Sequence, residues 1–431
     1  IYNYSHPLLT DLTVSDNYRG LFINGSCSPT ITGAVLSDNS DRGLYISSSS
    51  HPLISDVIVT GNHEGGVRIH NNSDPTLTNI SVIDNEDTNE GGGFLITNTS
   101  DPILENIQVR GNTSINSGGG ISIKDNSHPT LIGVTIADNT SNQGGGIYFY
   151  NNSTAIFDSD NRSSIYLNTA NSINGSDLYA YNSPLISVVV DTFSVMSPTD
   201  FYAYPVENYS FDILNFQIEQ IGSAVYVNPL TGDDANPGSS FDAPLRTITN
   251  ALLRVVADSL NPGTIYLADG EYLPLEPPVR RSETVYMDNG ERLPELNEEI
   301  FPINCLDYVN IIGSSREGTI LDAQNSGRVI YCNGDDGFSL SNLTVTGGNS
   351  GEGSGMYIME SDPVLDNIAL INNSGSGIDI RNWSSPTLNN IIVSGNSGDG
   401  IYIYNYSHPL LTDLTVSDNS RGLHINGSCS P

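Results

Sequence analysis

The sequence predicts an all-β solenoid in which short strands wind into stacked coils, and three observations lead to this prediction. A small or polar residue followed by proline recurs at steps of 22 to 27 residues, an alternating apolar run follows each such proline, and the run ends at an asparagine. Alternation of apolar and polar residues indicates strands with one buried face. A single coil of this size cannot close a core, whereas stacked coils bury a continuous apolar column.

These marker prolines fall into two blocks. In the first block they are Pro7, Pro29, Pro52, Pro75, Pro102, Pro129 and Pro184. In the second block they are Pro363, Pro386, Pro409 and Pro431. One coil without a marker proline, near Ala155, fills the longest gap in the first block.

Each coil has two apolar runs separated by a glycine-rich corner. In one coil Ile54, Val57 and Val59 form the first run, and Val67 and Ile69 form the second. Because the return side is a strand rather than a helix, the pattern favours a parallel β-helix over a leucine-rich horseshoe. At about 4.8 Å per coil, roughly a dozen coils would form a rod of about 60 Å.

An asparagine closes the first run of nearly every coil. Its side chain tolerates left-handed geometry, bonds nearby backbone groups and can stack on its equivalents as an amide ladder. The Asn-x-Ser/Thr triplets are therefore interpreted as corners rather than glycosylation sites. The repeated asparagines are Asn17, Asn39, Asn62, Asn85, Asn112, Asn139, Asn373, Asn396 and Asn419.

A much longer repeat joins the two ends of the sequence. Residues 1–29 recur as residues 403–431 at an offset of 402, with Tyr18 replaced by Ser420 and Phe22 by His424. We therefore expect the chain to be a window of a tandem array whose unit is about 402 residues long, and we expect identical units to associate end to end.

The fading of the short repeat predicts the domain organisation. The expected parts are 1–185 (the C-terminal part of one β-helix unit), 186–222 (a closing or linking β segment), 223–272 (the N-terminal cap of the next unit) and 273–431 (the first coils of that unit, with a surface excursion over 273–300). The cap contains the one predicted helix, over 244–260, because Ile248, Ala251 and Leu252 lie on one helical face. We expect this helix to cover the open first coil, since an uncovered sheet edge invites aggregation.

Composition narrows the choice of partners. The net charge of −34 argues against nucleic acid and anionic lipid, and no apolar run is long enough to insert in a membrane. Lys124 is the only lysine. Cys305 and Cys332 lie 27 residues apart, about one coil, and are either a disulfide or two buried thiols.

Three segments carry a resemblance to known proteins. Residues 225–239 (VYVNPLTGDDANPGS), 243–252 (APLRTITNAL) and 263–272 (GTIYLADGEY) resemble the DUF1565-type start of right-handed parallel β-helix proteins. The coils resemble the pectin-lyase-like superfamily, which implies a right-handed solenoid. Lyases of that superfamily use calcium-binding carboxylates and a Lys or Arg base. Here the basic candidates Lys124, Arg68, Arg110 and Arg381 are scattered over different coils, so we expect no enzyme.

One loop is the candidate metal site. Asp233, Asp234 and Asn236 offer oxygen ligands at a spacing that suits a hard cation, so calcium is the only cofactor considered. The competing interpretation is an Asx-rich turn stopped by Pro237 and Gly238, because the full alternation of an EF-hand loop is missing.

One outward column is rich in aromatic residues. Its position is the residue between the paired apolar residues of the second run, and it holds Phe22, Tyr45, Tyr148, Tyr357 and Tyr402. Exposed aromatics on a flat sheet suit either packing and self-association or glycan binding; packing is favoured.

The features together predict an extracellular structural repeat protein that forms a filament, stalk or giant adhesin. We expect it at the surface of, or outside, a prokaryotic cell. The alternative is a polysaccharide lyase or hydrolase, or a glycan-binding module, on the same scaffold. The superfamily resemblance and the aromatic column favour this alternative.

Overall fold

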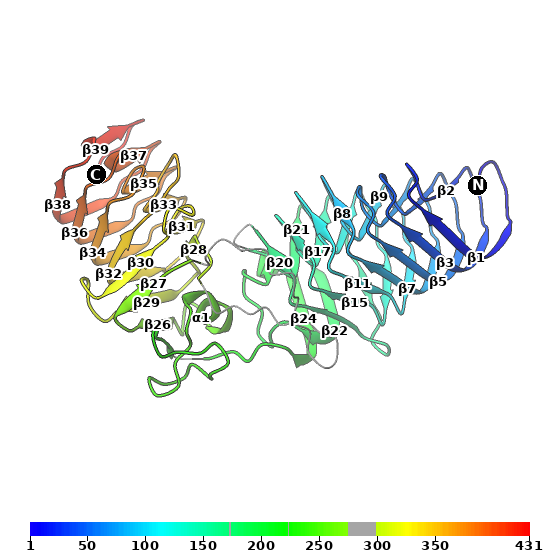
Figure 1. The fold of residues 1–431 in the computed structure, drawn as a ribbon, viewed down its shortest axis with the longest axis horizontal. Helices are drawn as coiled ribbons and strands as arrows, with labels where there is room; N and C mark the ends of the chain where they lie inside the picture. The colour runs from blue at the N-terminus through cyan, green and yellow to red at the C-terminus, as the bar shows by residue number, and fades with distance from the viewer. Residues whose placement is uncertain (172–173, 223, 275–298) are drawn as a thin grey trace. The chain divides into compact units, whose positions relative to one another are not determined.

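The computed structural model describes residues 1–171, 174–222, 224–274 and 299–431. The chain divides into two compact units, Ile1–Glu219 (unit 1) and Gln220–Pro431 (unit 2). In each unit short parallel strands stack coil upon coil and form the faces of a β-helix (Figure 1). The all-β parallel solenoid predicted from the sequence is confirmed.

Unit 1 has three parallel sheets. The long-strand sheet contains β1 (Leu8–Ser15), β3 (Thr30–Ser37), β5 (Leu53–Thr60), β7 (Thr76–Ile83), β10 (Ile103–Glu105), β11 (Gln108–Arg110), β14 (Thr130–Ile132), β15 (Thr135–Ala137), β18 (Ile156–Phe157), β19 (Ser163–Tyr166), β22 (Ile186–Phe193) and β24 (Tyr209–Phe216). The short-strand sheet contains β2 (Leu21–Asn24), β4 (Leu44–Ser47), β6 (Val67–His70), β9 (Phe94–Thr97), β13 (Ile121–Lys124), β17 (Ile147–Tyr150), β21 (Leu178–Tyr181) and β23 (Ala203–Tyr204). The corner sheet contains β8 (Glu86–Asp87), β12 (Thr113–Ser114), β16 (Thr140–Ser141) and β20 (Thr169–Ala170). A 3₁₀ turn, η1 (Val206–Asn208), precedes β24.

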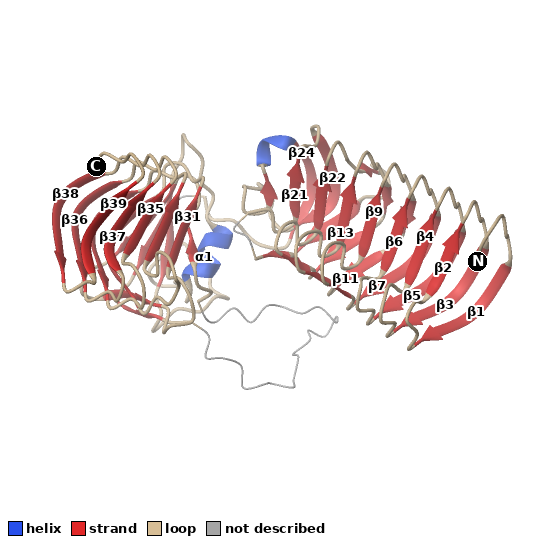
Figure 2. Cartoon of the chain, turned by 90° about the horizontal axis from the view of Figure 1, so that it is seen from above, coloured by secondary structure: helices blue, strands red, loops and turns tan. Residues whose placement is uncertain are grey.

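Unit 2 has two parallel sheets and one α-helix. Its long-strand sheet contains β25 (Ala224–Val227), β26 (Gly263–Leu267), β27 (Gly270–Tyr272), β29 (Val309–Gly313), β30 (Thr319–Asp322), β32 (Ser339–Thr346), β34 (Val364–Ile371), β36 (Thr387–Ser394) and β38 (Leu410–Ser417). Its short-strand sheet contains β28 (Ile303–Asn304), β31 (Ile330–Asn333), β33 (Met356–Met359), β35 (Ile378–Arg381), β37 (Asp399–Tyr404) and β39 (Arg421–Asn426). The helix is α1 (Ile248–Arg254), which Figure 2 shows among strands and loops.

Equivalent residues of successive coils pair in register. Leu12, Ala34, Val57 and Ile80 form one such column along the long-strand sheet of unit 1. The last three are buried, and Leu12 is half-buried because β1 has only one neighbouring strand in this sheet. The apolar columns therefore point inward and form the core, as the alternation predicts.

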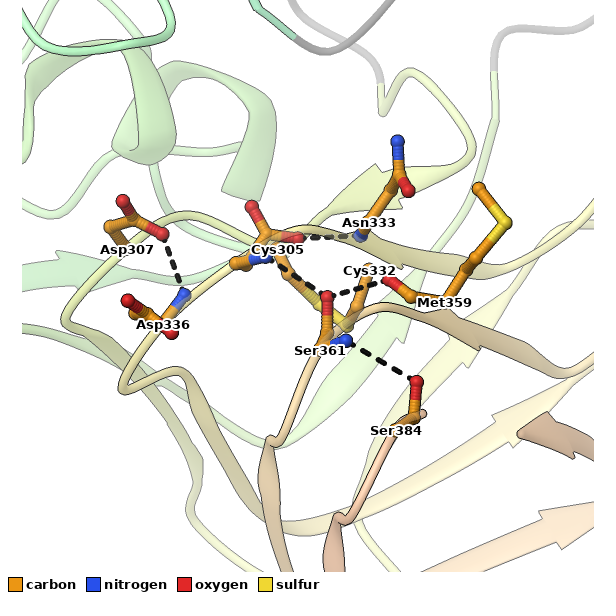
Figure 3. The surroundings of a disulfide bond; sticks show 9 residues. Cys305, Asp307, Cys332, Asn333, Asp336, Met359, Ser361 and Ser384 are labelled. Carbon is orange, nitrogen blue, oxygen red and sulfur yellow. Dashed lines mark hydrogen bonds between the residues drawn. A yellow bond between two sulfur atoms is a disulfide. The ribbon is translucent and has the colours of Figure 1, made fainter. Parts of the chain in front are cut away.

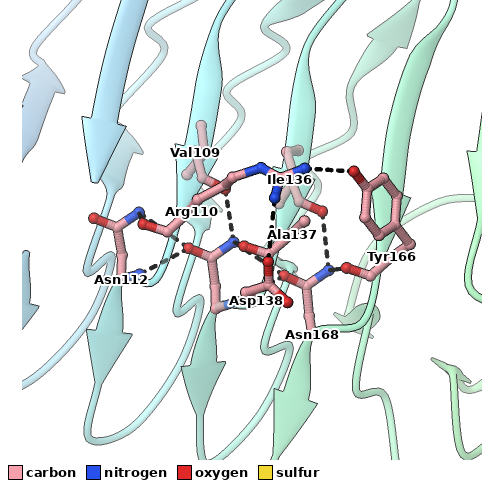
Figure 4. A network of polar contacts seen from close by, with 9 residues as sticks. Val109, Arg110, Asn112, Ile136, Ala137, Asp138, Tyr166 and Asn168 are labelled. Atoms are coloured by element: carbon pink, nitrogen blue, oxygen red, sulfur yellow. Dashed lines mark hydrogen bonds and ion pairs between the residues drawn. The ribbon is translucent and has the colours of Figure 1, made fainter. Parts of the chain in front are cut away.

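Stacked asparagines form the predicted amide ladder (Figure 4). Asn112 accepts hydrogen bonds at Oδ1 from the backbone N and the Nδ2 of Asn85, at 3.1 and 2.9 Å, and donates from Nδ2 to Asn139 Oδ1 at 3.0 Å. The same links join Asn39, Asn62, Asn85, Asn112, Asn139 and Asn168 in unit 1, and Asn373, Asn396 and Asn419 in unit 2. The ladder satisfies side-chain groups that would otherwise be buried without partners.

The corner sheet explains why some coils have about 27 residues rather than 22 or 23. Its two-residue strands occupy the extra length, and the triple-glycine corners pass close to it. A Cβ on Gly92 would lie 2.5 Å from the carbonyl oxygen of Thr113, so only glycine fits this corner. The sequence pattern did not predict this third sheet.

Helix α1 is shorter than the predicted range of 244–260. Thr247 caps its N-terminus by accepting a hydrogen bond from Asn250 N, and the Glu299 carboxylate accepts hydrogen bonds from Ile248 N and Thr249 N. The helix ends because Val255 is extended, at ψ 133°. The backbone then pairs with Ile221 instead of continuing the helix.

The described coils are more numerous than predicted. The long-strand path crosses nine strands in unit 1 and seven in unit 2, against the dozen expected for a whole repeat. Most of the predicted excursion over 273–300 lies outside the described residues; at its ends Pro274 pairs with Glu299. Among the described residues there is no helix long and apolar enough to cross a bilayer.

Candidate functional site

The short-strand sheets carry the predicted aromatic column. In unit 1 Phe22 pairs with Tyr45, and their rings stack at 4.5 Å and 12°. In unit 2 Tyr357 and Tyr402 occupy the same column but are separated by Asp379. Phe22 and Tyr45 are therefore in direct contact, whereas one coil lies between Tyr357 and Tyr402.

Tyr148 belongs to a separate group. Three coils separate it from Tyr45, and its ring instead stacks on Tyr179 at 5.6 Å and on Tyr150 at 6.3 Å. Tyr148 is only 8% exposed, and this burial raises the pKa of its hydroxyl. The expectation of an exposed column is therefore wrong at Tyr148, because neighbouring rings cover one another.

Arginines fill the spaces between the rings in unit 2. The guanidinium of Arg328 lies 4.4 Å from the ring centre of Tyr357 and 5.2 Å from that of Tyr331. Arg381 lies 5.4 Å from Tyr357 and 5.2 Å from Tyr402. Each cation–π contact contributes roughly 0.5–2 kcal/mol. Arg381 therefore bridges the gap that Asp379 leaves in the aromatic column.

Asp379 is the buried carboxylate of this face. Desolvation raises its pKa, and the positive charge of Arg381 opposes that rise. The Arg381 guanidinium binds Asp379 at 3.0 Å and Glu352 at 2.9 Å. Two carboxylates therefore hold one arginine in place between two tyrosine rings.

A second carboxylate is held one coil further on. Asp399 accepts hydrogen bonds from Nε and Nη2 of Arg421 and lies 2.7 Å from Nδ1 of His424. The His424 ring also contacts the ring of Tyr402, at 4.7 Å. A carboxylate that orients an imidazole is the arrangement on this face that comes nearest to a general base.

Unit 1 has a buried ion pair at its corner, between Arg42 before β4 and Asp87 of β8. Arg42 Nη2 binds Asp87 Oδ2 at 2.5 Å across the Cα of Gly65, where a Cβ would lie 2.5 Å from Arg42 Nη1. His70 Nε2 contacts the Tyr45 hydroxyl at 2.6 Å. Desolvation, with a smaller effect of nearby positive charge, lowers the pKa of His70 to about 4. His70 is therefore neutral at physiological pH.

The three predicted calcium ligands lie in one loop, but each has other partners. Asp234 accepts hydrogen bonds from Arg246 N, Thr247 N and the Thr247 hydroxyl. Asp233 Oδ1 accepts one from the backbone N two residues on, and Asn236 Nδ2 donates to the carbonyl of Pro244. Asp233 thus forms an Asx turn, and Asp234 and Asn236 tie this loop to the residues that lead into α1. Calcium binding here stays a prediction.

The two cysteines left open by the sequence form a disulfide, Cys305–Cys332 (Figure 3). With Asp335 they make the one group of three ligating side chains found close together among the described residues. The sulfur atoms are bonded to each other, so they are not thiolates available to a metal. Ser361 Oγ accepts a hydrogen bond from Asp335 N at 2.9 Å and so ties this corner to the next coil.

The outer faces are built mainly of paired charges and stacked rings. Asp379, Asp399 and Asp87 each bind an arginine, so none of them is an unengaged base. Sequence reasoning missed Asp399, Arg421 and His424 as a group, because it followed only the central position of the short strand. The position three residues earlier in each coil would have revealed Asp399 and Arg421.

The fold and these faces define a β-helical repeat protein. The family model described as "Right handed beta helix region" matches residues 1–169 and 316–431. The chain therefore belongs to the right-handed β-helix family. A second model, "Protein of unknown function (DUF1565)", matches residues 230–276. No curated protein matches this chain. The fold is common to pectate-lyase-like enzymes and to non-enzymes, so membership alone does not decide whether the chain is an enzyme.

Proposed function

We propose that the protein is a structural repeat protein, outside the cell or on its surface, whose β-helical units follow one another in a tandem array and form a filament, stalk or giant adhesin. The observation that carries this proposal is the coil shared by residues 1–29 and 403–431. We call it the joint coil.

The joint coil has closely similar backbone conformations in its two copies, although the short strand of the second copy begins two residues earlier. Strands β1 and β38 cover the same eight residues of each copy. The left-handed backbone positions also coincide: Asn3 and Asn405, Tyr4 and Tyr406, Asp11 and Asp413, Asp16 and Asp418, Gly25 and Gly427, and Ser26 and Ser428. Nearly identical sequence and the matching left-handed positions support treating the two copies as the same structural position.

The two copies have neighbours on opposite sides. The first copy is followed by β3, and the second is preceded by β36. In the first copy Asn17 N donates to Asn39 Oδ1, and in the second copy Asn396 Nδ2 donates to Asn419 Oδ1. Asn17 and Asn419 are the same ladder position, so an array would continue the ladder through this coil.

Superimposing the two copies defines a repeating unit that runs from unit 2 through the joint coil into the rest of unit 1. Such a unit has fifteen coils along the long-strand path, given seven and nine strands that share one coil. At about 4.8 Å per coil its β-helix is about 70 Å long. Residues 224–274, with Ile248, Ala251 and Leu252 of α1 packed on Val225 and Val227, would be its N-terminal cap.

One further feature supports a location outside the cytosol, and the charge bears on how rods associate. The Cys305–Cys332 disulfide suits an oxidising compartment. The charge of −34 keeps neighbouring rods apart unless cations screen them. Calcium is the cation that the loop of Asp233 and Asp234 would bind.

Electron microscopy of a chain carrying three consecutive 402-residue units tests the proposal. We expect rods with a regular axial repeat of about 70 Å plus the length of the connection between units. Fibres should lengthen in proportion to the number of units. Particles without a constant axial repeat would contradict the tandem-rod interpretation.

The alternative is a carbohydrate-active enzyme, and the Asp399–His424 pair favours it. The test is a lyase assay on uronic-acid polysaccharides, with absorbance of the unsaturated product read with and without calcium. Turnover that is lost in His424→Ala but kept in His51→Ala would replace the structural proposal. If the unchanged chain shows no turnover with or without calcium, the structural proposal is supported.

A further inference from the structure

The turn between the short strand and the marker proline is built from paired left-handed residues. The second residue of each pair is called the turn position here. In unit 1 it is occupied by Tyr4, Ser26, Ser49, Asn72, Thr99, Asn126 and Asn152. Asparagine suits this position because its short polar side chain tolerates a positive φ.

Bulky aromatic residues break this rule at Tyr4 in unit 1 and in two neighbouring coils of unit 2. Trp383 and Tyr406 both occupy the turn position at φ 59°. Trp383 N donates to the carbonyl of Asn405 at 3.0 Å, which places the two turns side by side. A bulky side chain in the left-handed region costs about 1 kcal/mol or more relative to a residue that tolerates it.

Burial does not offset this cost. Trp383 is 63% exposed and Tyr406 is 48% exposed. Their rings lie parallel, at 5.8 Å and 8°, and form an exposed aromatic pair. Exposed aromatics held in an unfavourable backbone conformation indicate a binding role more than a folding role.

The groups around the aromatic pair indicate which class of ligand would fit. The first residues of the two turns, Asn382 and Asn405, are hydrogen-bonded to each other at 2.7 Å. Ser385 and His408 follow two residues after the rings and are exposed. In the preceding coil the carboxylate of Asp362 accepts a hydrogen bond from Ser385 N. Apolar ring surfaces flanked by amide, hydroxyl and carboxylate groups suit a neutral polar ligand with an apolar face.

We propose that Trp383 and Tyr406 bind a neutral glycan. Its sugar rings would lay their C–H faces on the aromatic pair, and the flanking polar groups would bond its hydroxyls. A uronic-acid chain does not fit, because Asp362 and the net charge of −34 repel it. The site lies on the turns and not in the aromatic column of the short-strand sheet.

The proposal does not depend on the tandem array, since one chain contains the whole site. If the array also exists, each unit repeats the site and binding to a polymeric glycan gains avidity. A single chain that binds short oligosaccharides therefore tests the site without testing the array.

Trp383 is the only tryptophan of the sequence, so its fluorescence reports on this site alone. The full 431-residue chain is titrated with the neutral hexasaccharides of cellulose, xylan, mannan, chitin and starch, and with an oligogalacturonide. We expect a saturable fluorescence change with at least one neutral hexasaccharide, and none with the oligogalacturonide. Calorimetry on the same pairs gives the affinity.

Asparagine substitutions separate binding from folding. Trp383→Asn and Tyr406→Asn install the residue that other coils use at this turn, so both variants should keep or raise the thermal midpoint while losing at least tenfold in affinity. Tyr4→Asn changes the equivalent tyrosine of the other joint-coil copy and should leave the affinity unchanged. The proposal is overturned if no neutral hexasaccharide binds, if Tyr406→Asn binds as well as the unchanged chain, or if the oligogalacturonide or an apolar peptide binds instead.

Discussion

Truncation of Asn112 is the sharpest test of how the coils are held together. Asn112 is fully buried and makes five side-chain hydrogen bonds. Oδ1 accepts from Asn85 N and Nδ2, and Nδ2 donates to Val82 O, Arg110 O and Asn139 Oδ1. Because Nδ2 has only two hydrogens for its three acceptors, these contacts count as about four full hydrogen bonds, or about 4 kcal/mol at about 1 kcal/mol each. Asn112→Ala should therefore destabilise unit 1 by about 3–5 kcal/mol.

The lower end of the 3–5 kcal/mol range applies if neighbouring residues keep some of their hydrogen bonds in the variant. Asn85 Nδ2 retains hydrogen bonds to Val59 O and Ile83 O when Asn112 is truncated. The backbone N–H of Asn85 has no such substitute, because its acceptor is Asn112 Oδ1. The largest local effect should therefore appear at this amide.

Urea unfolding and hydrogen exchange measure the two effects. We expect the amide of Asn85 to exchange about 10²–10³-fold faster in Asn112→Ala, which corresponds to about 3–4 kcal/mol. The matched control is Asn17→Ala. Asn17 is exposed, and its side chain donates only to Ser15 O at 2.9 Å, so the loss should stay within about 1 kcal/mol. Equal losses in the two variants would refute the ladder argument.

Three further perturbations have defined outcomes. Burial raises the pKa of Asp177 to about 7 from 3.8, so the folded state holds a proton that the unfolded state releases, and the free energy of unfolding should fall as pH rises from about 4 through 7. Asp177→Asn should remove up to about 4 kcal/mol of that loss. In urea unfolding the variant should therefore be more stable than the unchanged chain at pH 8 but not at pH 4. Gly119→Ala places a Cβ 2.5 Å from a backbone carbonyl oxygen and should cost about 3 kcal/mol in thermal unfolding, whereas Gly351→Ala meets nothing within 4 Å and should stay within about 0.5 kcal/mol. Reduction of Cys305–Cys332, which spans 27 residues, should cost about 3–4 kcal/mol by loop entropy, and an unchanged unfolding midpoint after reduction would contradict this.

The coils and their inward faces could be predicted because the signals are local. Residues such as Ile54 and Val57 alternate with polar residues inside one strand, and the structure buries both. Asn62 and Asn85 recur at one position of the coil, and they form the ladder that the repeat implied. A period visible in sequence becomes a column in space whenever coils stack in register.

The candidate sites were harder to predict because they depend on long side chains that contact residues in other coils. Arg42 crosses one coil to bind Asp87, 45 residues away, and this path exists only because Gly65 has no side chain. The side chain of Arg381 extends from its own strand to the Asp379 carboxylate and lies over the ring of Tyr357 in the neighbouring coil. A long side chain has possible partners in several coils, so its pairing cannot be predicted from the repeat.

The ends of the amide ladder bear on where one repeating unit stops. In unit 1 the ladder ends at Asn168, whose Nδ2 donates to the buried Asp177 carboxylate at 2.9 Å. In unit 2 it begins at Asn373, where Oδ1 accepts from Gly348 N. Both ends are closed by other groups, whereas in the proposed array the joint coil would lie inside one continuous ladder. A unit cut at the joint coil would break the ladder at its middle, so the natural boundary is better placed after Asp177 than at this coil.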